Sequence, residues 1–279
     1  MRLFLEHARR QLSSLYPDLE VDAMMNQLLQ SVTGFSRTQL LLHKNSELSP
    51  ENRQLLLGML DRLQNSEPLQ YVLGETEFFG LTFLVNRAVL IPRPETEELV
   101  ELIIRENAYK PCSILDIGTG SGCIAIALAA KLPNAQVEAW DISESALEVA
   151  RENAIRNNQS VLFKRVDVLS NDFEQNSFDV IVSNPPYICE SESKEMHTNV
   201  LDFEPHNALF VPDSDPLIFY RRIAELAQKM LNTAGRIYFE INAAYGKETA
   251  DLLREKGFSE VKIVKDIFGK NRIVTGVKP

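Results

Sequence analysis

Apolar positions recur with two different spacings along this chain. Over residues 1–66 they follow a helical spacing, to which Leu3, Leu12 and Leu15 belong. From Ser113 onward, short continuous apolar runs alternate with longer segments of helical period. A short apolar run is typical of a buried strand, whereas spacings of three and four residues are typical of an amphipathic helix. The pattern therefore predicts an N-terminal helical region followed by an α/β region.

Helix start and stop signals divide the N-terminal region. One helix is expected to end at Gly34, and the hydroxyl of Ser36 is suited to cap the next one. Ser49 followed by Pro50 predicts the start of a further helix, because proline is tolerated in a first helical turn. We predict a small helical domain at residues 1–70, which is either a stabilising cap or a platform for a substrate or partner.

Residues 71–92 have a different character. Their aromatic and β-branched run at residues 78–85 contains a glycine, which predicts a β-hairpin that links two domains. Pro94 and the acidic residues after it then suit the first turn of a helix, whose N-terminus is the positive end of its dipole. This turn has either a structural role alone or a place at the border of an active cleft.

Residues 93–279 are predicted to form a doubly wound, Rossmann-like α/β domain. A short turn near Gly269 should join the last two strands, so we expect an antiparallel hairpin at the end of the sheet. The expected strands are residues 114–117, 137–140, 161–166, 178–183, 236–241, 261–265 and 272–277, and the expected helices are residues 123–131, 145–157, 216–231 and 246–256.

Composition narrows the classes of function. The formal charge of -10 disfavours a protein that tracks long nucleic acid, whose affinity comes largely from Lys and Arg. The sequence has no run of roughly 20 apolar residues and no signal-peptide core, so we expect neither a membrane span nor secretion. Cys112, Cys123 and Cys189 are scattered and odd in number, which favours reduced thiols in a cytoplasmic protein.

A glycine-rich turn follows the first strand of the α/β domain. It reads Asp-Ile-Gly-Thr-Gly-Ser-Gly at residues 116–122, and Asp141 ends the next strand about 20 residues later. Dinucleotide, nucleotide and S-adenosylmethionine (SAM) sites all use such turns, and an acidic side chain at the second strand can accept the ribose hydroxyls. The lack of a lysine after the glycines disfavours ATP, and the spacing of the glycines fits SAM better than NAD.

A stiff corner, Asn184-Pro185-Pro186-Tyr187, ends the fourth strand. Neither proline can donate a ladder hydrogen bond, and each favours an extended conformation in the residue before it. The corner therefore presents acceptors, namely the Asn184 side-chain oxygen and successive carbonyls, followed by an aromatic ring. Such a corner suits a planar –NH2 group that needs both hydrogens held and one face covered. We call residues 184–187 the NPPY corner.

Taken together, these segments resemble the SAM-dependent N-methyltransferases, and specifically the HemK-type release-factor glutamine methyltransferases. The resemblance extends over nearly the whole chain, although the Glu-Ile-Asn at residues 240–242 replaces an expected Glu-Ile-Gly. The NPPY corner alone is shared with DNA adenine methyltransferases, and the Ile-Pro-Arg-Pro-Glu-Thr segment is more specific. The segments that carry the resemblance are the helical N-terminus and residues 68–74, 89–97, 116–122, 183–188, 203–205 and 208–209.

The resemblance implies methyl transfer from SAM, with S-adenosylhomocysteine as product, to the glutamine side chain in the Gly-Gly-Gln loop of peptide chain release factors. It implies that Asn184 and the Pro185 carbonyl hold the two amide hydrogens, and that Tyr187 packs on the amide plane. Pro186 completes this substrate site, and Asn184 also borders the cofactor. The implied cofactor contacts are Gly118, Thr119, Gly120, Ser121 and Gly122 for the methionine moiety, Asp141 for the ribose and Asp167 for the adenine amino group.

Two rival functions remain at this point. A nucleic-acid adenine N6-methyltransferase would use the same corner on a flipped base, but it should also carry a basic recognition region. A non-enzymatic SAM-binding or scaffold protein would have no need of the NPPY corner. We expect no metal, because His7, His43, His197 and His206 lack metal-ligand spacing and SAM carries its own leaving group.

Overall fold

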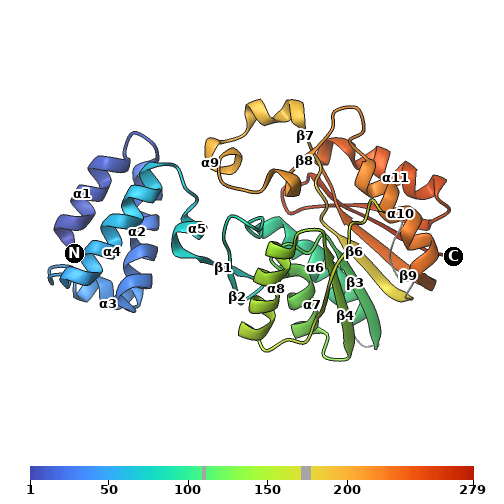
Figure 1. Ribbon diagram of the computed structural model, residues 1–279, viewed down its shortest axis with the longest axis horizontal. Helices are drawn as coiled ribbons and strands as arrows, with labels where there is room; N and C mark the ends of the chain where they lie inside the picture. Colours follow the sequence, from blue (N-terminus) through green and yellow to red (C-terminus); the bar gives the residue numbers. More distant parts are fainter. Residues whose placement is uncertain (109–110, 171–176) are drawn as a thin grey trace. The chain divides into compact units, whose positions relative to one another are not determined.

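The computed structural model describes residues 1–108, 111–170 and 177–279. The chain forms two compact units (Figure 1). The first consists of Met1–Glu75 with His197–Phe203, and the second consists of Thr76–Met196 with Glu204–Pro279. The first unit thus takes up a short segment from the second half of the sequence, which the apolar pattern did not predict.

The first unit is helical, as the sequence predicts. Ser36 caps its helix through a reciprocal box with Gln39, and the Ser49 hydroxyl accepts a hydrogen bond from the Asn52 backbone N–H. Leucine and methionine side chains from different helices meet in one apolar core. The helices of the first unit are α1 (Arg2–Leu12), α2 (Asp18–Thr33), α3 (Arg37–Leu42), α4 (Pro50–Gln64), α5 (Leu69–Leu73) and the later α9 (Thr198–Leu201).

The buried face of α1 differs from the leucine pattern. Phe4, Ala8 and Leu12 are buried at four-residue spacing, whereas Leu3 is 81% exposed and Leu15 is 49% exposed. Residues four apart lie on one side of a helix, so a face that contains Phe4 and Ala8 turns Leu3 toward solvent. Leu15 lies beyond the end of the helix.

The predicted β-hairpin is present as β1 (Glu75–Phe78) and β2 (Leu81–Leu84). The buried side chain of Asn153 ties β2 to the rest of the second unit. Its Oδ1 accepts the Leu84 backbone N–H at 2.6 Å, and its Nδ2 donates to the carbonyls of Leu84 and Ser121. One amide group therefore fixes both the hairpin and the glycine turn.

The second unit contains a seven-stranded sheet in the order β10-β11-β9-β6-β3-β4-β5, which confirms the doubly wound prediction. Strands β9, β6, β3, β4 and β5 are parallel, and β10 and β11 form the antiparallel hairpin expected at the end. The bounds are β3 (Cys112–Ile117), β4 (Ala135–Asp141), β5 (Leu162–Arg165), β6 (Phe178–Ser183), β9 (Leu231–Glu240), β10 (Ser259–Lys265) and β11 (Asn271–Val277).

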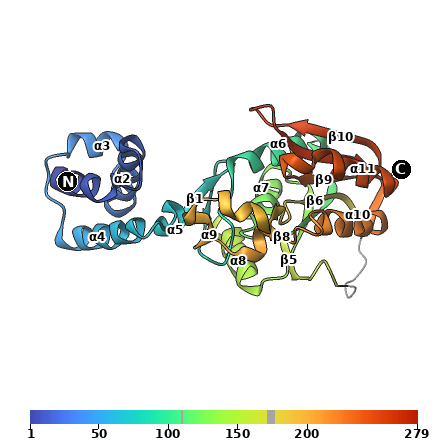
Figure 2. The same cartoon turned by 90° about the horizontal axis from the view of Figure 1, so that it is seen from above.

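Helices cover both faces of this sheet (Figures 1 and 2). Apolar side chains of α6 and α7 pack on one face, and those of α10 and α11 pack on the other. The helices of this unit are α6 (Pro94–Asn107), α7 (Cys123–Lys131), α8 (Glu144–Arg156), α10 (Ile218–Met230) and α11 (Gly246–Glu255). No helix in the described ranges has the length and apolar character that a bilayer crossing requires.

Strand β9 starts earlier than its apolar run predicts. Its first residue, Leu231, pairs with Phe178, and regular pairing resumes at Arg236 after an irregularity that contains Ala234 at φ 62°. The polar and small residues of this irregular segment show no alternation of apolar and polar positions. The early start of β9 is therefore visible only from its hydrogen bonds to the neighbouring strand. The short pair β7 (Ile188–Cys189) and β8 (Phe210–Val211) was also not predicted, because two-residue strands have no readable period.

Candidate active site

Three strand ends meet where the sequence places its motifs. Strand β3 lies between β6 and β4, with Ile117 beside Ser183 on one side and Trp140 on the other. The glycine turn after β3 therefore lies between the NPPY corner and Asp141. The Ser183 hydroxyl donates to the Ile117 carbonyl at 2.6 Å, which anchors the start of the corner to the start of the turn.

A cavity of about 240 Å³ opens at these strand ends. Its lining contains seven of the residues singled out from the sequence: Gly118, Gly120, Asp141, Asp167, Asn184, Pro185 and Pro186. Most of the remaining lining is apolar and includes Leu90, Trp140, Val168 and Phe219. An apolar cavity with a few convergent polar groups is the usual form of a small-molecule site.

The glycine turn presents backbone to this cavity. Gly118 and Gly120 have φ values of +75° and +54°, and a Cβ on either would meet no atom within 4 Å. The N–H groups of Gly118 and Thr119 donate to the Trp140 carbonyl, each at 2.9 Å, so the turn is held against the neighbouring strand. A side chain at Gly118 or Gly120 would be strained and would project into open space that a ligand could use.

The other residues of the turn support it from behind. Thr119 and Ser121 are buried, and the Thr119 hydroxyl donates to Asp116 Oδ2 at 2.6 Å. A Cβ on Gly122 would lie 2.9 Å from Ile126 Cδ1 and 3.2 Å from Ala150 Cβ, so glycine is needed there for close packing between α7 and α8. Direct contact between these three residues and a cofactor stays a prediction.

Asp141 is held in place by the backbone around it. Its Oδ2 accepts the Gly120 N–H and its Oδ1 accepts the Ser143 N–H, both at 2.9 Å. Burial raises the pKa of Asp141, and the hydrogen bonds from these N–H groups oppose that rise. Each carboxylate oxygen can accept a second hydrogen bond, so Asp141 keeps the capacity to bind hydroxyl groups in the cavity.

Asp167 follows β5 and is exposed at the border of the same cavity. Its Oδ1 accepts the Leu169 backbone N–H at 2.9 Å, which shapes the turn after the strand. Its other oxygen has no hydrogen bond from the described residues. Asp167 thus lies at the cavity with an acceptor oxygen available, and its contact with the adenine amino group stays a prediction.

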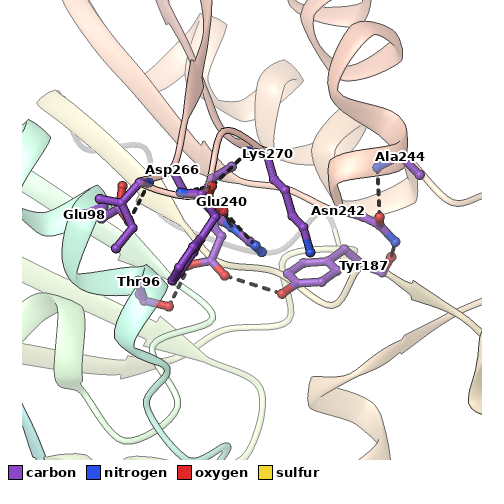
Figure 3. Close-up of polar contacts among 11 residues, drawn as sticks. Thr96, Glu98, Tyr187, Glu240, Asn242, Ala244, Asp266 and Lys270 are labelled. Atoms are coloured by element: carbon purple, nitrogen blue, oxygen red, sulfur yellow. Dashed lines mark hydrogen bonds and ion pairs between the residues drawn. The ribbon is translucent and has the colours of Figure 1, made fainter. Parts of the chain in front are cut away.

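The NPPY corner is tied to two distant elements, and Figure 3 shows the contact of Tyr187 with Glu240. Asn184 Nδ2 donates to Thr96 Oγ1 of α6 at 3.4 Å, and the Tyr187 hydroxyl donates to Glu240 Oε1 of β9 at 3.4 Å. Within the described part of the chain, no group donates to Asn184 Oδ1 or to the Pro185 carbonyl. The corner therefore presents two acceptors that the protein leaves open, as its backbone geometry predicts.

Glu240 is a buried carboxylate in contact with this corner, and the residue is 1% exposed. Burial raises the pKa of Glu240, whereas the Thr96 hydrogen bond and the positive charge of Arg272 act in the opposite direction. Burial and the nearby Glu240 charge raise the pKa of the Tyr187 hydroxyl, which keeps it protonated as a donor. Thr96 and Glu240 received no role from the sequence.

Glu204 holds one wall of the cavity in place and is 3% exposed. Its carboxylate pairs with the Arg93 guanidinium at 2.6 Å and accepts the Ile91 backbone N–H at 3.3 Å. Val89 and Leu90, just before these partners, line the cavity. The Ile-Pro-Arg segment is thus fixed by a charged residue more than a hundred positions away.

Among the described residues, no group of three or more His, Cys, Asp or Glu could hold a metal ion.

Replacing Asp116 with asparagine should stabilise the cofactor-free protein in a pH-dependent manner. Burial raises the pKa of Asp116 from 3.8 to about 7, despite the hydrogen bond from Thr119. In the wild type, the free energy of unfolding falls as pH rises from 3.8 to about 7, because the carboxyl ionises in the unfolded chain while it stays neutral in the folded protein. The asparagine variant lacks this loss, so its advantage in free energy of unfolding should grow across this pH range and level off above it.

Urea unfolding of both proteins at about pH 5 and about pH 8 measures this difference, and the advantage of the variant should be larger at the higher pH. A difference that is equal at both values would mean that Asp116 ionises normally in the folded protein.

Comparison with known proteins places these features in one family of sequences. Residues 4–74 match the family model of the PrmC N-terminal domain, and residues 96–203 match that of the Methyltransferase small domain. The chain is 48% identical to the release factor glutamine methyltransferase of Bacteroides thetaiotaomicron, over 99% of both chains. It is also 48% identical to the release factor glutamine methyltransferase of Flavobacterium psychrophilum, over 94% of both chains.

A solved structure supports the fold. The chain resembles a methyltransferase from Pyrococcus furiosus, with a TM-score of 0.54 and 22% identity over 72% of this chain and 90% of that one. The similarity shows a shared methyltransferase fold, with a mostly parallel central sheet, and says nothing more about the reaction.

Proposed function

This chain belongs to the release factor glutamine methyltransferases, and we propose that its NPPY corner is where the glutamine is held. The chain is a SAM-dependent protein-glutamine N5-methyltransferase of peptide chain release factors. We propose that the glutamine it modifies is the one in their Gly-Gly-Gln loop. The observation that carries the proposed site is the pair of open acceptors, Asn184 Oδ1 and the Pro185 carbonyl, beside the cavity.

An amide nitrogen is a poor nucleophile, because its lone pair is delocalised into the adjacent carbonyl. The Asn184 oxygen and the Pro185 carbonyl can each accept one of the two amide hydrogens, which fixes the nitrogen and favours positive charge on it. We propose that the ring of Tyr187, whose hydroxyl is held by Glu240, covers the amide plane. These residues thus orient the amide nitrogen toward the cavity and shield it from water.

The residues at the cavity fit SAM. The open backbone at Gly118 and Gly120 leaves room for the methionine moiety, and Asp141 retains acceptor capacity for the ribose hydroxyls. When bound, SAM would supply a methyl group on a positively charged sulfur. The sulfur would then leave as the neutral thioether of S-adenosylhomocysteine. We propose that Gly118 through Gly122 hold the methionine moiety, with Thr119 and Ser121 acting through the backbone, and that Asp167 receives the adenine amino group.

The domain roles follow from the same proposal. We propose that residues 1–70 recognise the release factor, that residues 71–92 link the domains and that residues 93–279 carry the methyltransferase chemistry. The helical unit has its own apolar core, which suits a separate recognition module. The net charge of -10 favours a protein substrate over long nucleic acid, and a substrate that acts in translation favours a cytoplasmic location.

Incubation with methyl-labelled SAM tests the assignment of substrate. We expect label on the release factor and none on a DNA duplex supplied in the same mixture, because the relatives of the chain are release factor glutamine methyltransferases and its net charge of -10 disfavours binding to DNA phosphates. A matched release factor whose loop glutamine is replaced by glutamate serves as the control and should remain unlabelled. Label on DNA but not on release factor would favour an adenine N6-methyltransferase instead.

A further inference from the structure

Asn184 is linked to a buried carboxylate through one hydroxyl group, and Figure 3 shows the Thr96–Glu240 part of this link. The Thr96 hydroxyl donates to Glu240 Oε2 at 2.7 Å, and Asn184 Nδ2 donates to the same Thr96 oxygen at 3.4 Å. Thr96 is 2% exposed and lies in the first turn of α6. The chain Asn184–Thr96–Glu240 thus joins three segments that are far apart in the sequence.

The direction of these hydrogen bonds follows from the number of protons that each group has to donate. An ionised carboxylate can only accept, so the single hydroxyl proton of Thr96 is committed to Glu240. The Thr96 oxygen can then only accept from Asn184, which requires the NH2 end of the Asn184 amide to face Thr96. The carbonyl end of the same amide must consequently face away from Thr96, on the side where the acceptor is needed.

Burial raises the pKa of Glu240, and several neighbours act against that rise and support its charged form. Arg272, from β11, exerts an attractive Coulomb interaction on it, and the Tyr187 hydroxyl donates to its second oxygen. Glu95, from α6, acts in the opposite direction. The Tyr220 hydroxyl of α10 donates to the Glu240 backbone carbonyl at 3.1 Å, which fixes the end of β9. The two oxygens of one carboxylate therefore hold both ends of the NPPY corner.

We propose that Thr96 and Glu240 are positioning residues that lock the Asn184 amide with its oxygen toward the substrate. An unlocked asparagine amide can rotate by half a turn and present its NH2 group instead. That orientation would place two donors opposite the two donors of the glutamine amide. The proposal rests on the proposed function, because it assigns these residues through the acceptor role of Asn184.

The test compares Thr96→Val, which removes the hydroxyl, with Thr96→Ser, which keeps it. Thr96→Val should lower kcat for methylation of a release factor by about tenfold, which is the worth of one hydrogen bond. Thr96→Ser should stay within a factor of about two of the wild type. The affinity for SAM, measured by calorimetry, should be the same in both variants, since Thr96 does not line the cavity. Thr96→Cys, with its weak thiol donor, is a second variant in case the valine variant is unstable.

A double-mutant cycle separates positioning from a general structural role. If Thr96 acts through Asn184, Thr96→Val should have no further effect on kcat in an Asn184→Ala background. A tenfold loss in both backgrounds, or equal activity of the valine and serine variants, would overturn the proposal. A wild-type protein that fails to methylate release factor would instead contradict the proposed function, so the two failures are distinguishable.

Discussion

Replacing Asn184 with alanine should lower kcat for glutamine methylation by roughly 10²- to 10³-fold, the cost of removing one group that stabilises developing charge. The variant loses the oxygen that accepts one amide hydrogen, and the glutamine nitrogen is then free to rotate away from the cavity. Affinity for SAM should remain largely intact, because the glycine turn and Asp141 are held by their own hydrogen bonds. Single-turnover assays with saturating SAM measure the chemical step directly.

Asn207→Ala is the matched control for this experiment. Asn207 is also an asparagine in the lining of the cavity, but it lies in the short η2 helix (His206–Ala208) and not at the corner. It should change kcat by no more than about threefold, the scale of a weak solvent-exposed contact. If the two alanine variants were equally impaired, polarity of the cavity and not the corner geometry would explain the loss.

Replacing Asp141 with alanine should raise the Kd for SAM by roughly 10- to 100-fold, the worth of hydrogen bonds to a charged acceptor. The variant loses the acceptor proposed for the ribose, and it also leaves the Gly120 and Ser143 N–H groups without their partner. The glycine turn should loosen as a result, which adds to the loss of affinity. Titration calorimetry with SAM and with S-adenosylhomocysteine measures the combined loss of affinity for each ligand.

Asp167→Ala should have a smaller effect on the same Kd, of about three- to tenfold. Asp167 is exposed and its proposed contact is a single hydrogen bond to the adenine amino group, which water can replace. Equal losses in the two variants, or a greater loss for Asp167, would contradict the assignment of Asp141 to the ribose.

Local chemistry made much of this molecule predictable. The caps at Ser36 and Ser49 and the alternation of strands and helices are written in short segments of sequence, and the structure contains them. The stiffness of the NPPY corner follows from two adjacent prolines, so its open acceptors could also be expected. Because the carboxyl ends of parallel strands meet at one edge, the sequence also placed Asp141 and the glycine turn beside this corner.

The contacts that support the NPPY corner and the glycine turn could not be predicted from the sequence, for a physical reason. The Thr96 hydroxyl and the Glu240 carboxylate are separated by 144 positions, and no periodicity or spacing connects them. The same holds for the amide of Asn153, which joins the hairpin to the glycine turn. Such contacts depend on how helices and strands pack, and one polar side chain in an apolar segment is the sole local sign of them. Glu240, an acidic residue after the buried run Ile237-Tyr238-Phe239, carried that sign.

Tandem mass spectrometry of a full-length release factor after reaction with SAM tests the central claim most directly. The claim is that the NPPY corner presents a glutamine amide nitrogen for methylation. We expect one added methyl group, located on the side-chain nitrogen of the glutamine in the Gly-Gly-Gln loop, and we expect its yield to collapse with the Asn184→Ala variant. A methyl group at another residue, or an undiminished yield from that variant, would contradict the account.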